Sequence, residues 1–175
     1  MKLMSAQSVS APVRRWKVSR ALALSAALVC ASGATMAASG PFTGLDGLWS
    51  GTGTVALTDG TKERMRCRAQ YLVMEEGNNL QQSLRCESDT YKFHVTAYVN
   101  SKAGSLSGVW TEETRNVSGR ISGKAKAGRI QISVASAGGF SAKMNLVTSG
   151  NQQTVTITPK GTEVKQVTVS ARKTK

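Results

Sequence analysis

The sequence predicts an all-β protein, an antiparallel meander of about ten strands closed into a barrel, with a β-sandwich as the alternative. From residue 47 onward, short stretches alternate apolar and polar residues with the period of a strand, and none has helical periodicity. Turn-forming residues separate these stretches at spacings of roughly 8–12 residues. A sheet of that many strands with one apolar face must fold over or close. Because closure also removes exposed edges, we favour the barrel.

The first 37 residues have the three parts of a secretory signal peptide. A basic segment precedes the apolar run 21–31, and small residues in Thr35-Met36-Ala37 predict cleavage after Ala37. The basic residues are Arg14, Arg15, Lys17 and Arg20. We therefore expect a signal-peptide helix at 1–37, followed by one barrel domain at 38–175 that is periplasmic or secreted.

The type of export signal is left open by two features of this segment. Arg14-Arg15 suggests the twin-arginine route, but Trp16-Lys17-Val18 matches that signal loosely, so an ordinary basic segment is favoured. Cys30 suggests a lipid anchor, but the preceding Val29 is bulky where such a signal requires a small residue. No later stretch approaches roughly 18 consecutive apolar residues, so no transmembrane span is expected in the mature chain.

The mature chain is basic. Removing Lys2 together with Arg14, Arg15, Lys17 and Arg20 lowers the net charge from +13 to +8. Scattered lysines and arginines keep a β-protein soluble and protect its strand edges, which is the interpretation we favour. The alternative is attraction to an anionic envelope surface.

The first strand begins at Gly47-Leu48-Trp49. Alternation places Trp49, Gly51 and Gly53 on one face, and the two glycines mark positions where the chain bends or another backbone approaches closely. The turn 58–61, of the Asp-Gly kind, leads into a second strand at 62–74.

The turn after residue 74 fixes a register that pairs two cysteines. Paired positions sum to 153 for either a two- or a four-residue loop, so Cys67 faces Cys86 on the inner side. In an oxidising compartment these cysteines are expected to form a disulfide. On the outer face the same register sets Arg66 against Glu87, Arg64 against Asp89, and Arg68 against Arg85.

Seven further strands follow the same alternation, and Pro159-Lys160-Gly161 is predicted to be the last turn. Residues 172–175 are expected to fray. The later strands are predicted at 91–100, 105–111, 116–122, 129–136, 140–146, 154–158 and 163–171.

Five large aromatic residues are predicted to face inward: Trp49, Tyr71, Phe93, Trp110 and Phe140. The favoured interpretation is that they fill the core. The functional interpretation is that some of them line a ligand pocket at the barrel mouth.

The leading Gly47-Leu48-Trp49-Ser50-Gly51-Thr52-Gly53 resembles the calycin superfamily, the lipocalin-like and avidin-like exported barrels, and is similar to the opening of nitrobindin-like proteins. The resemblance implies that Trp49 closes one end of the barrel while the other mouth admits a small apolar ligand. The later lipocalin motifs do not match. His94, the only candidate for a nitrobindin-type haem ligand, falls on the predicted outer face.

The chain offers one histidine, few carboxylates and no Cys-x-x-Cys, so neither catalysis nor a metal site is expected, and no cofactor is predicted. Lys124, Lys126 and Arg129 gather at one turn without an aromatic residue, so nucleic acid is not an expected partner. The sequence thus favours an exported barrel for a hydrophobic or amphipathic ligand. The alternative is a non-enzymatic envelope module whose packed barrel binds an anionic surface or a protein.

Overall fold

The computed structural model describes residues 39–126 and 128–174, so the predicted signal peptide lies outside the described residues. The described chain consists of ten strands and one short 3-10 helix, η1, at Glu75–Gly77. The strands are β1 (Gly47–Leu57), β2 (Lys62–Met74), β3 (Asn79–Glu87), β4 (Lys92–Lys102), β5 (Ser105–Glu112), β6 (Val117–Lys126), β7 (Arg129–Ser136), β8 (Ser141–Ser149), β9 (Gln152–Lys160) and β10 (Val164–Lys173).

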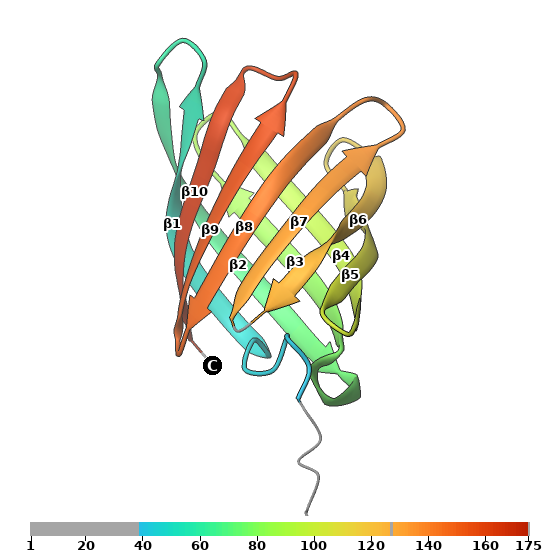
Figure 1. Cartoon of the computed structure of the whole chain (residues 1–175). Coiled ribbons are helices and arrows are strands. Elements are labelled where there is room, and N and C mark those ends of the chain that lie inside the picture. Colours follow the sequence, from blue (N-terminus) through green and yellow to red (C-terminus); the bar gives the residue numbers. More distant parts are fainter. Residues whose placement is uncertain (1–38, 127, 175) are drawn as a thin grey trace, which may run out of the picture. The chain divides into compact units, whose positions relative to one another are not determined.

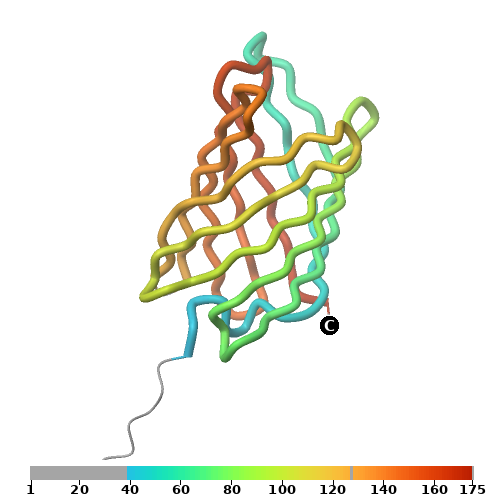
Figure 2. The backbone as a smooth tube through the Cα atoms, turned by 90° about the vertical axis from the view of Figure 1, so that its right-hand side faces the viewer, coloured from blue at the N-terminus to red at the C-terminus, as the bar shows by residue number. Residues whose placement is uncertain are grey.

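The ten strands form a closed antiparallel barrel in which each strand pairs with its neighbours in sequence and β10 pairs with β1 (Figures 1 and 2). The predicted meander is confirmed, and closure excludes the sandwich. No helix in the described ranges is long and apolar enough to cross a bilayer. We call the end that carries residues 39–46 and the β2–β3 turn the lower end, as in Figure 1.

The seam between β1 and β10 depends on glycine. Trp49 and Val55 point inward and are buried, as the alternation predicted. A methyl group on Gly51 would lie 2.0 Å from the carbonyl oxygen of Ser170, and one on Gly53 would lie 2.6 Å from that of Thr168. The predicted close approach of another backbone is therefore confirmed, and the approaching strand is the one that closes the barrel.

The β2–β3 hairpin has the predicted register. Cys67 lies opposite Cys86 with Cα atoms 4.1 Å apart, and the two form a disulfide on the inner face. On the outer face, the pairing of Arg66 with Glu87 and of Arg68 with Arg85 is also as predicted. The predicted pairing of Arg64 with Asp89 is wrong, because β3 ends at Glu87 and the chain turns before Asp89.

Several predicted boundaries are also wrong, among them the end of β8, which is Ser149 and not residue 146, and the start of β9, which is Gln152 and not residue 154. β6 continues beyond Ser122 to Lys126 because β5 and β7 pair with it on both sides. Pro159 lies within β9, opposite Ala142, where the strand is about to end. The final strand does not fray after Ala171, since Lys173 pairs with Trp49 and the Thr174 N–H donates to Leu48 O at 2.8 Å. Barrel closure therefore keeps the C-terminal residues in the sheet.

Inward side chains form two packed clusters. The larger one contains aromatic and aliphatic side chains from β1 to β8 and from the segment before β1, and Val134 and Phe140 of the upper part pack against it. The smaller one lies between β1, β2, β3 and β10 and contains the disulfide. The members of the smaller cluster are Val55, Met65, Cys67, Cys86 and Val169.

Candidate functional site

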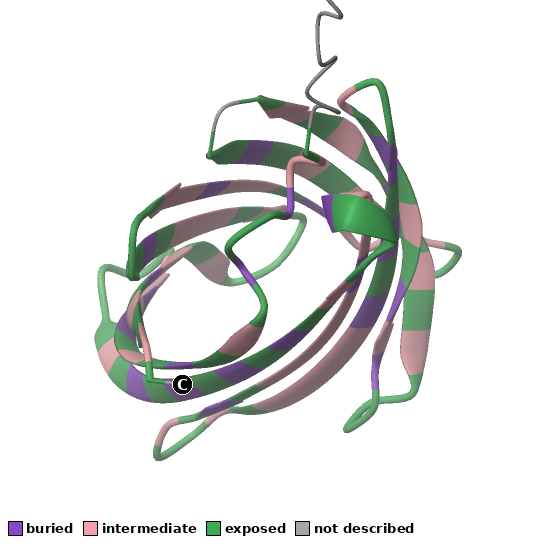
Figure 3. Cartoon of the chain, turned by 90° about the horizontal axis from the view of Figure 1, so that it is seen from below, coloured by how far each residue is buried: buried purple, intermediate pink, exposed green. Residues whose placement is uncertain are grey.

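Residues 40–46, which we call the lower plug, cross the lower opening of the barrel (Figure 3). The Gly40 N–H donates to Glu76 O at 2.8 Å, and the Phe42 N–H donates to Gly77 O at 3.1 Å. Phe42 and Leu45 are 1% and 3% exposed, so their side chains are inserted into the barrel. Burying two large apolar side chains and pairing the backbone attaches this segment firmly to the lower end.

Trp49 supports the plug from inside the barrel. Its indole N–H donates to Leu45 O at 2.8 Å, and its ring packs edge-on against Tyr71 with centroids 6.3 Å apart. Trp49 is 1% exposed. The closed end that the calycin resemblance implied is therefore present, although closure needs the plug as well as the tryptophan.

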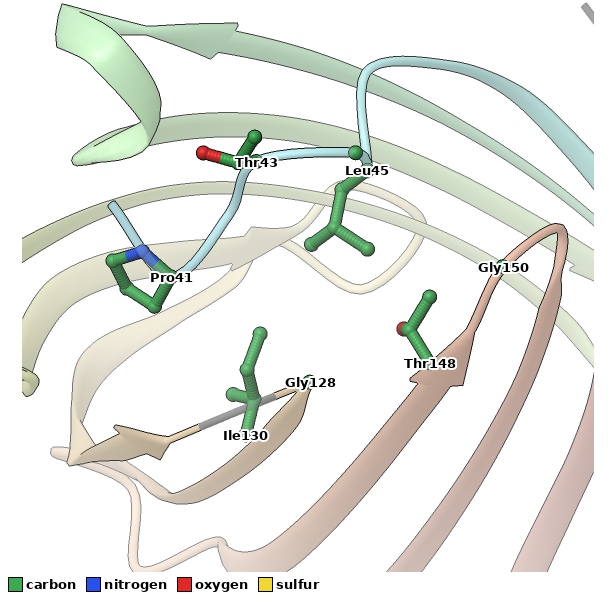
Figure 4. A pocket seen from close by; sticks show the side chains of 8 residues that line it. Pro41, Thr43, Leu45, Gly128, Ile130, Thr148 and Gly150 are labelled. Atoms are coloured by element: carbon green, nitrogen blue, oxygen red, sulfur yellow. The ribbon is translucent and has the colours of Figure 1, made fainter. Parts of the chain in front are cut away.

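The plug leaves a cavity of about 270 Å³ on the side of the β6–β7 and β8–β9 turns (Figure 4). Pro41, Thr43 and Leu45 line it from the plug, while Ile130 and Thr148 line it from β7 and β8. This volume lies just below the usual range for small-molecule sites, roughly 300–1,000 Å³.

A chain of polar side chains lies behind this cavity. The Tyr71 hydroxyl donates to Gln153 Oε1 at 2.9 Å, and Gln153 Nε2 donates to Thr148 Oγ1 at 3.4 Å. Gln153 is 3% exposed, so its amide depends on these contacts. Burial raises the pKa of Tyr71 to about 12, which keeps the phenol protonated as a donor. The sequence gives no signal that Gln153 is buried, because a glutamine in a polar strand is expected to be exposed.

The upper half of the interior is packed differently. Six inward-facing residues keep part of their apolar surface exposed. One lies on each of β4, β7, β8, β9 and β10, and the sixth, Phe140, lies just before β8. Their direction follows from the register, which places Ile157 beside Val167 and Val167 beside the buried Val55. We call these six residues the upper lining. They are Val95, Val134, Phe140, Met144, Ile157 and Val167.

The five aromatic residues predicted to line a pocket are divided between three places. Trp49 and Tyr71 meet at the lower end, and Trp110 packs edge-on against Phe140 with centroids 5.8 Å apart. Phe93 stacks against Tyr91 at 6.1 Å, and the Arg115 guanidinium lies 5.4 Å from the Phe93 ring centroid.

Of these five residues, Phe140 belongs to the upper lining, whereas Trp49, Tyr71 and Trp110 are buried. None of the five lines the cavity beside the plug. The hydrophobic residues that close the lower end, Phe42 and Leu45, were not among the predicted site residues, because they precede the first strand and follow no alternation.

A charged cluster lies at the upper end between β4 and the β5–β6 turn. The Glu112 carboxylate accepts hydrogen bonds from the backbone N–H groups of His94, Thr114 and Arg115 and lies 3.5 Å from Arg115 Nη1. Burial raises the pKa of Glu112, but these donors outweigh burial and leave the pKa below its usual value. A carboxylate held in this way stabilises the turn as an anion.

His94 faces outward, as predicted. Its Nδ1 lies 2.7 Å from Glu113 Oε2, and its Nε2 lies 3.5 Å from Ser83 Oγ. The residues of 39–126 and 128–174 include no group of three or more histidine, cysteine, aspartate or glutamate side chains placed to hold a metal. Most inward-facing side chains of the described strands are apolar or neutral. The charged ones, Glu63, Glu112 and Lys173, lie at the ends of the barrel and bind backbone groups of nearby turns or of the plug.

No family model matches the sequence, and no curated protein matches it. Solved structures do match the fold, among them the crystal structure of Rv2717c from M. tuberculosis, with a TM-score of 0.58 at 10% sequence identity. The match covers 76% of this chain and 94% of that one. At this identity the likeness shows the fold alone. The comparison therefore supports an antiparallel β-barrel and does not extend to membership of the calycin superfamily.

Proposed function

We propose that this chain is an exported protein that binds a small hydrophobic or amphipathic molecule in the upper half of its barrel. The observation that carries the proposal is the part-exposed apolar surface of the upper lining. Exposed apolar surface costs roughly 25 cal/mol for each Å², and a ligand that covers the lining recovers that free energy. Barrels of eight strands are just wide enough for side chains or one small ligand, so ten strands leave additional room.

Two further features support this proposal. The lower plug and Trp49 close one end, so a molecule held by the upper lining is enclosed from below. The disulfide between Cys67 and Cys86 stabilises the wall beside the lining and suits a protein that works in an oxidising compartment outside the cytoplasm. The proposed activity is binding without turnover.

The test is a titration with N-phenyl-1-naphthylamine, a neutral apolar dye whose fluorescence rises in a dry environment. We expect saturable binding, and we expect Val134→Phe, which fills the upper interior, to weaken it at least tenfold. The matched control is Ala135→Phe, because Ala135 is the next residue of β7 and is exposed on the outer face. Circular dichroism and thermal melting establish that both variants are folded.

Native mass spectrometry of the protein purified from its own compartment completes the test. A bound small molecule that Val134→Phe excludes would support the proposal. A bare mass together with no saturable dye binding would contradict it, as would equal weakening by the two phenylalanine substitutions.

A further inference from the structure

Five large apolar side chains on the outside of the barrel are 40% to 54% exposed, and all of them lie on β1, β2, β4 and β5. They are Leu48, Leu72, Met74, Tyr98 and Val109. Within the described residues, no large apolar side chain of β6 to β10 is exposed to this degree. Single exposed apolar residues are ordinary, but a group confined to one wall indicates an interaction surface.

The register makes part of this group continuous. Tyr98 lies opposite Val109, and Val109 lies opposite Arg120, so the three form one row across β4, β5 and β6. A groove of about 500 Å³ runs along this wall and is bordered by Met74, Tyr98, Val109 and Arg120. Figure 2 presents these green to yellow strands to the viewer. We call Met74, Tyr98, Val109 and the groove between them the outer-wall patch.

Cationic side chains border the outer-wall patch on the β4–β6 side. Arg120 ends the row of Tyr98 and Val109, and Ser105 pairs with both Lys102 and Lys124 below that row. The two ion pairs of the described residues, His94 with Glu113 and Arg115 with Glu112, involve none of these cations. The Glu75-Glu76 turn borders the opposite side, after Met74.

We propose that the outer-wall patch docks the barrel onto an anionic lipid surface, with Arg120, Lys124 and Lys102 facing the headgroups. A lipid surface fits because apolar side chains bounded by cations match an acyl layer beneath a negative plane. Tyr98 has the amphipathic ring that favours such an interface. The closed barrel has no free strand edge, so a partner chain cannot bind here by adding a strand.

The positive net charge of the mature chain favours the same encounter from a distance. The acidic Glu75-Glu76 turn sets the orientation, because it tilts the β2 side of the patch away from the headgroups. This inference does not rest on the proposed ligand, since it concerns the outer face and stands whether or not the interior binds a molecule.

The test measures cosedimentation of the mature protein with vesicles of phosphatidylcholine alone and with vesicles containing phosphatidylglycerol. We expect binding to the anionic vesicles, falling as salt is raised, and little binding to the neutral ones. Arg120→Gln with Lys124→Gln is expected to weaken binding about thirtyfold. The matched control, Lys160→Gln with Lys165→Gln, removes the same charge from exposed positions on β9 and β10 and is expected to have little effect.

A further double variant tests the apolar part of the outer-wall patch. Tyr98→Ser with Val109→Thr keeps every charge, and we expect it to weaken vesicle binding several-fold at 0.15 M salt. Equal losses in the two glutamine pairs would overturn the proposal, because they would show attraction to net charge alone. Absence of binding to anionic vesicles at low salt would also overturn it. So would a dimer in light scattering that Val109→Thr dissociates, which would make the patch an interface between two copies of this chain.

Discussion

At the lower end of the barrel, Leu45 and Trp49 are almost completely buried, whereas at the upper end Val134 and Ile157 keep part of their surface exposed although they also face inward. The two ends have the same strands and the same alternation. They differ because the plug enters the lower end alone, where its Phe42 and Leu45 join the larger packed cluster. Inward direction is therefore not sufficient for burial, because an inward side chain is buried only where neighbouring side chains or an extra segment of chain cover it.

The difference assigns separate tasks to the two ends. The lower end combines a backbone-bonded plug with the hydrogen bond from Trp49 to Leu45, which resists opening. The upper end is held by its turns, among them the one that Glu112 ties to β4. Binding sites in proteins are drawn from the less tightly packed regions, so the upper end is the better candidate for ligand access.

The largest effect is expected from the lower end. Trp49→Ala removes a fully buried ring and the hydrogen bond to the plug, and we expect it to lower the free energy of unfolding by about 3–5 kcal/mol. Trp49→Phe keeps much of the packing but leaves Leu45 O without its donor, at a cost of about 1–3 kcal/mol. Urea denaturation followed by circular dichroism measures both. A loss below about 1 kcal/mol for the alanine variant would show that Trp49 does not hold the lower end.

An intermediate effect is expected at the upper end from Glu112. The pKa of Glu112 is lowered in the folded protein, so its contribution is present above its unfolded value of about 4.5 and is lost as pH falls through the lower folded value. Glu112→Gln should cost about 1.5–3 kcal/mol at pH 7 and flatten the loss of stability below about pH 4.5. Chemical denaturation from pH 3 to 7 measures this, with Glu113→Gln as the control because Glu113 accepts no backbone hydrogen bond from the turn among the described residues. Identical pH profiles for wild type and Glu112→Gln would contradict the role of Glu112.

Much of the barrel follows from local chemistry that a single sequence contains. Alternation located the strands, and the turn before Asn79 fixed the pairing of Cys67 with Cys86. The glycines of β1 predicted that another backbone approaches closely, because such an approach leaves no space for a side chain. Gly51 beside Ser170 shows this. These are short-range constraints, and each residue carries its own signal.

The site could be predicted only in part, because its features depend on contacts between distant residues. The lower plug has no periodicity, and Phe42 is buried in it through contacts with distant segments, the larger cluster and Gly77 O of the β2–β3 turn. Gln153 is buried because Tyr71, on the other side of the seam strands β1 and β10, donates to it. The persistence of strand β10 to Lys173 likewise depends on β1 being its neighbour, which no local pattern at the C-terminus indicates.

The smallest change in stability is expected from truncating an isoleucine. It compares the two ends most directly, because an inward-facing isoleucine lies at each end. Ile130 is 8% exposed in the larger cluster, whereas Ile157 is a part-exposed member of the upper lining. We expect Ile130→Ala to cost about 2–5 kcal/mol and Ile157→Ala about 1 kcal/mol, because a side chain already in contact with water loses less on truncation and leaves a space that water can enter. Urea denaturation of the two variants measures the difference. Equal losses of unfolding free energy would show that the upper lining is as tightly packed as the larger cluster. A larger cost for Ile157→Ala with bound N-phenyl-1-naphthylamine than without it would show that the dye covers this side chain.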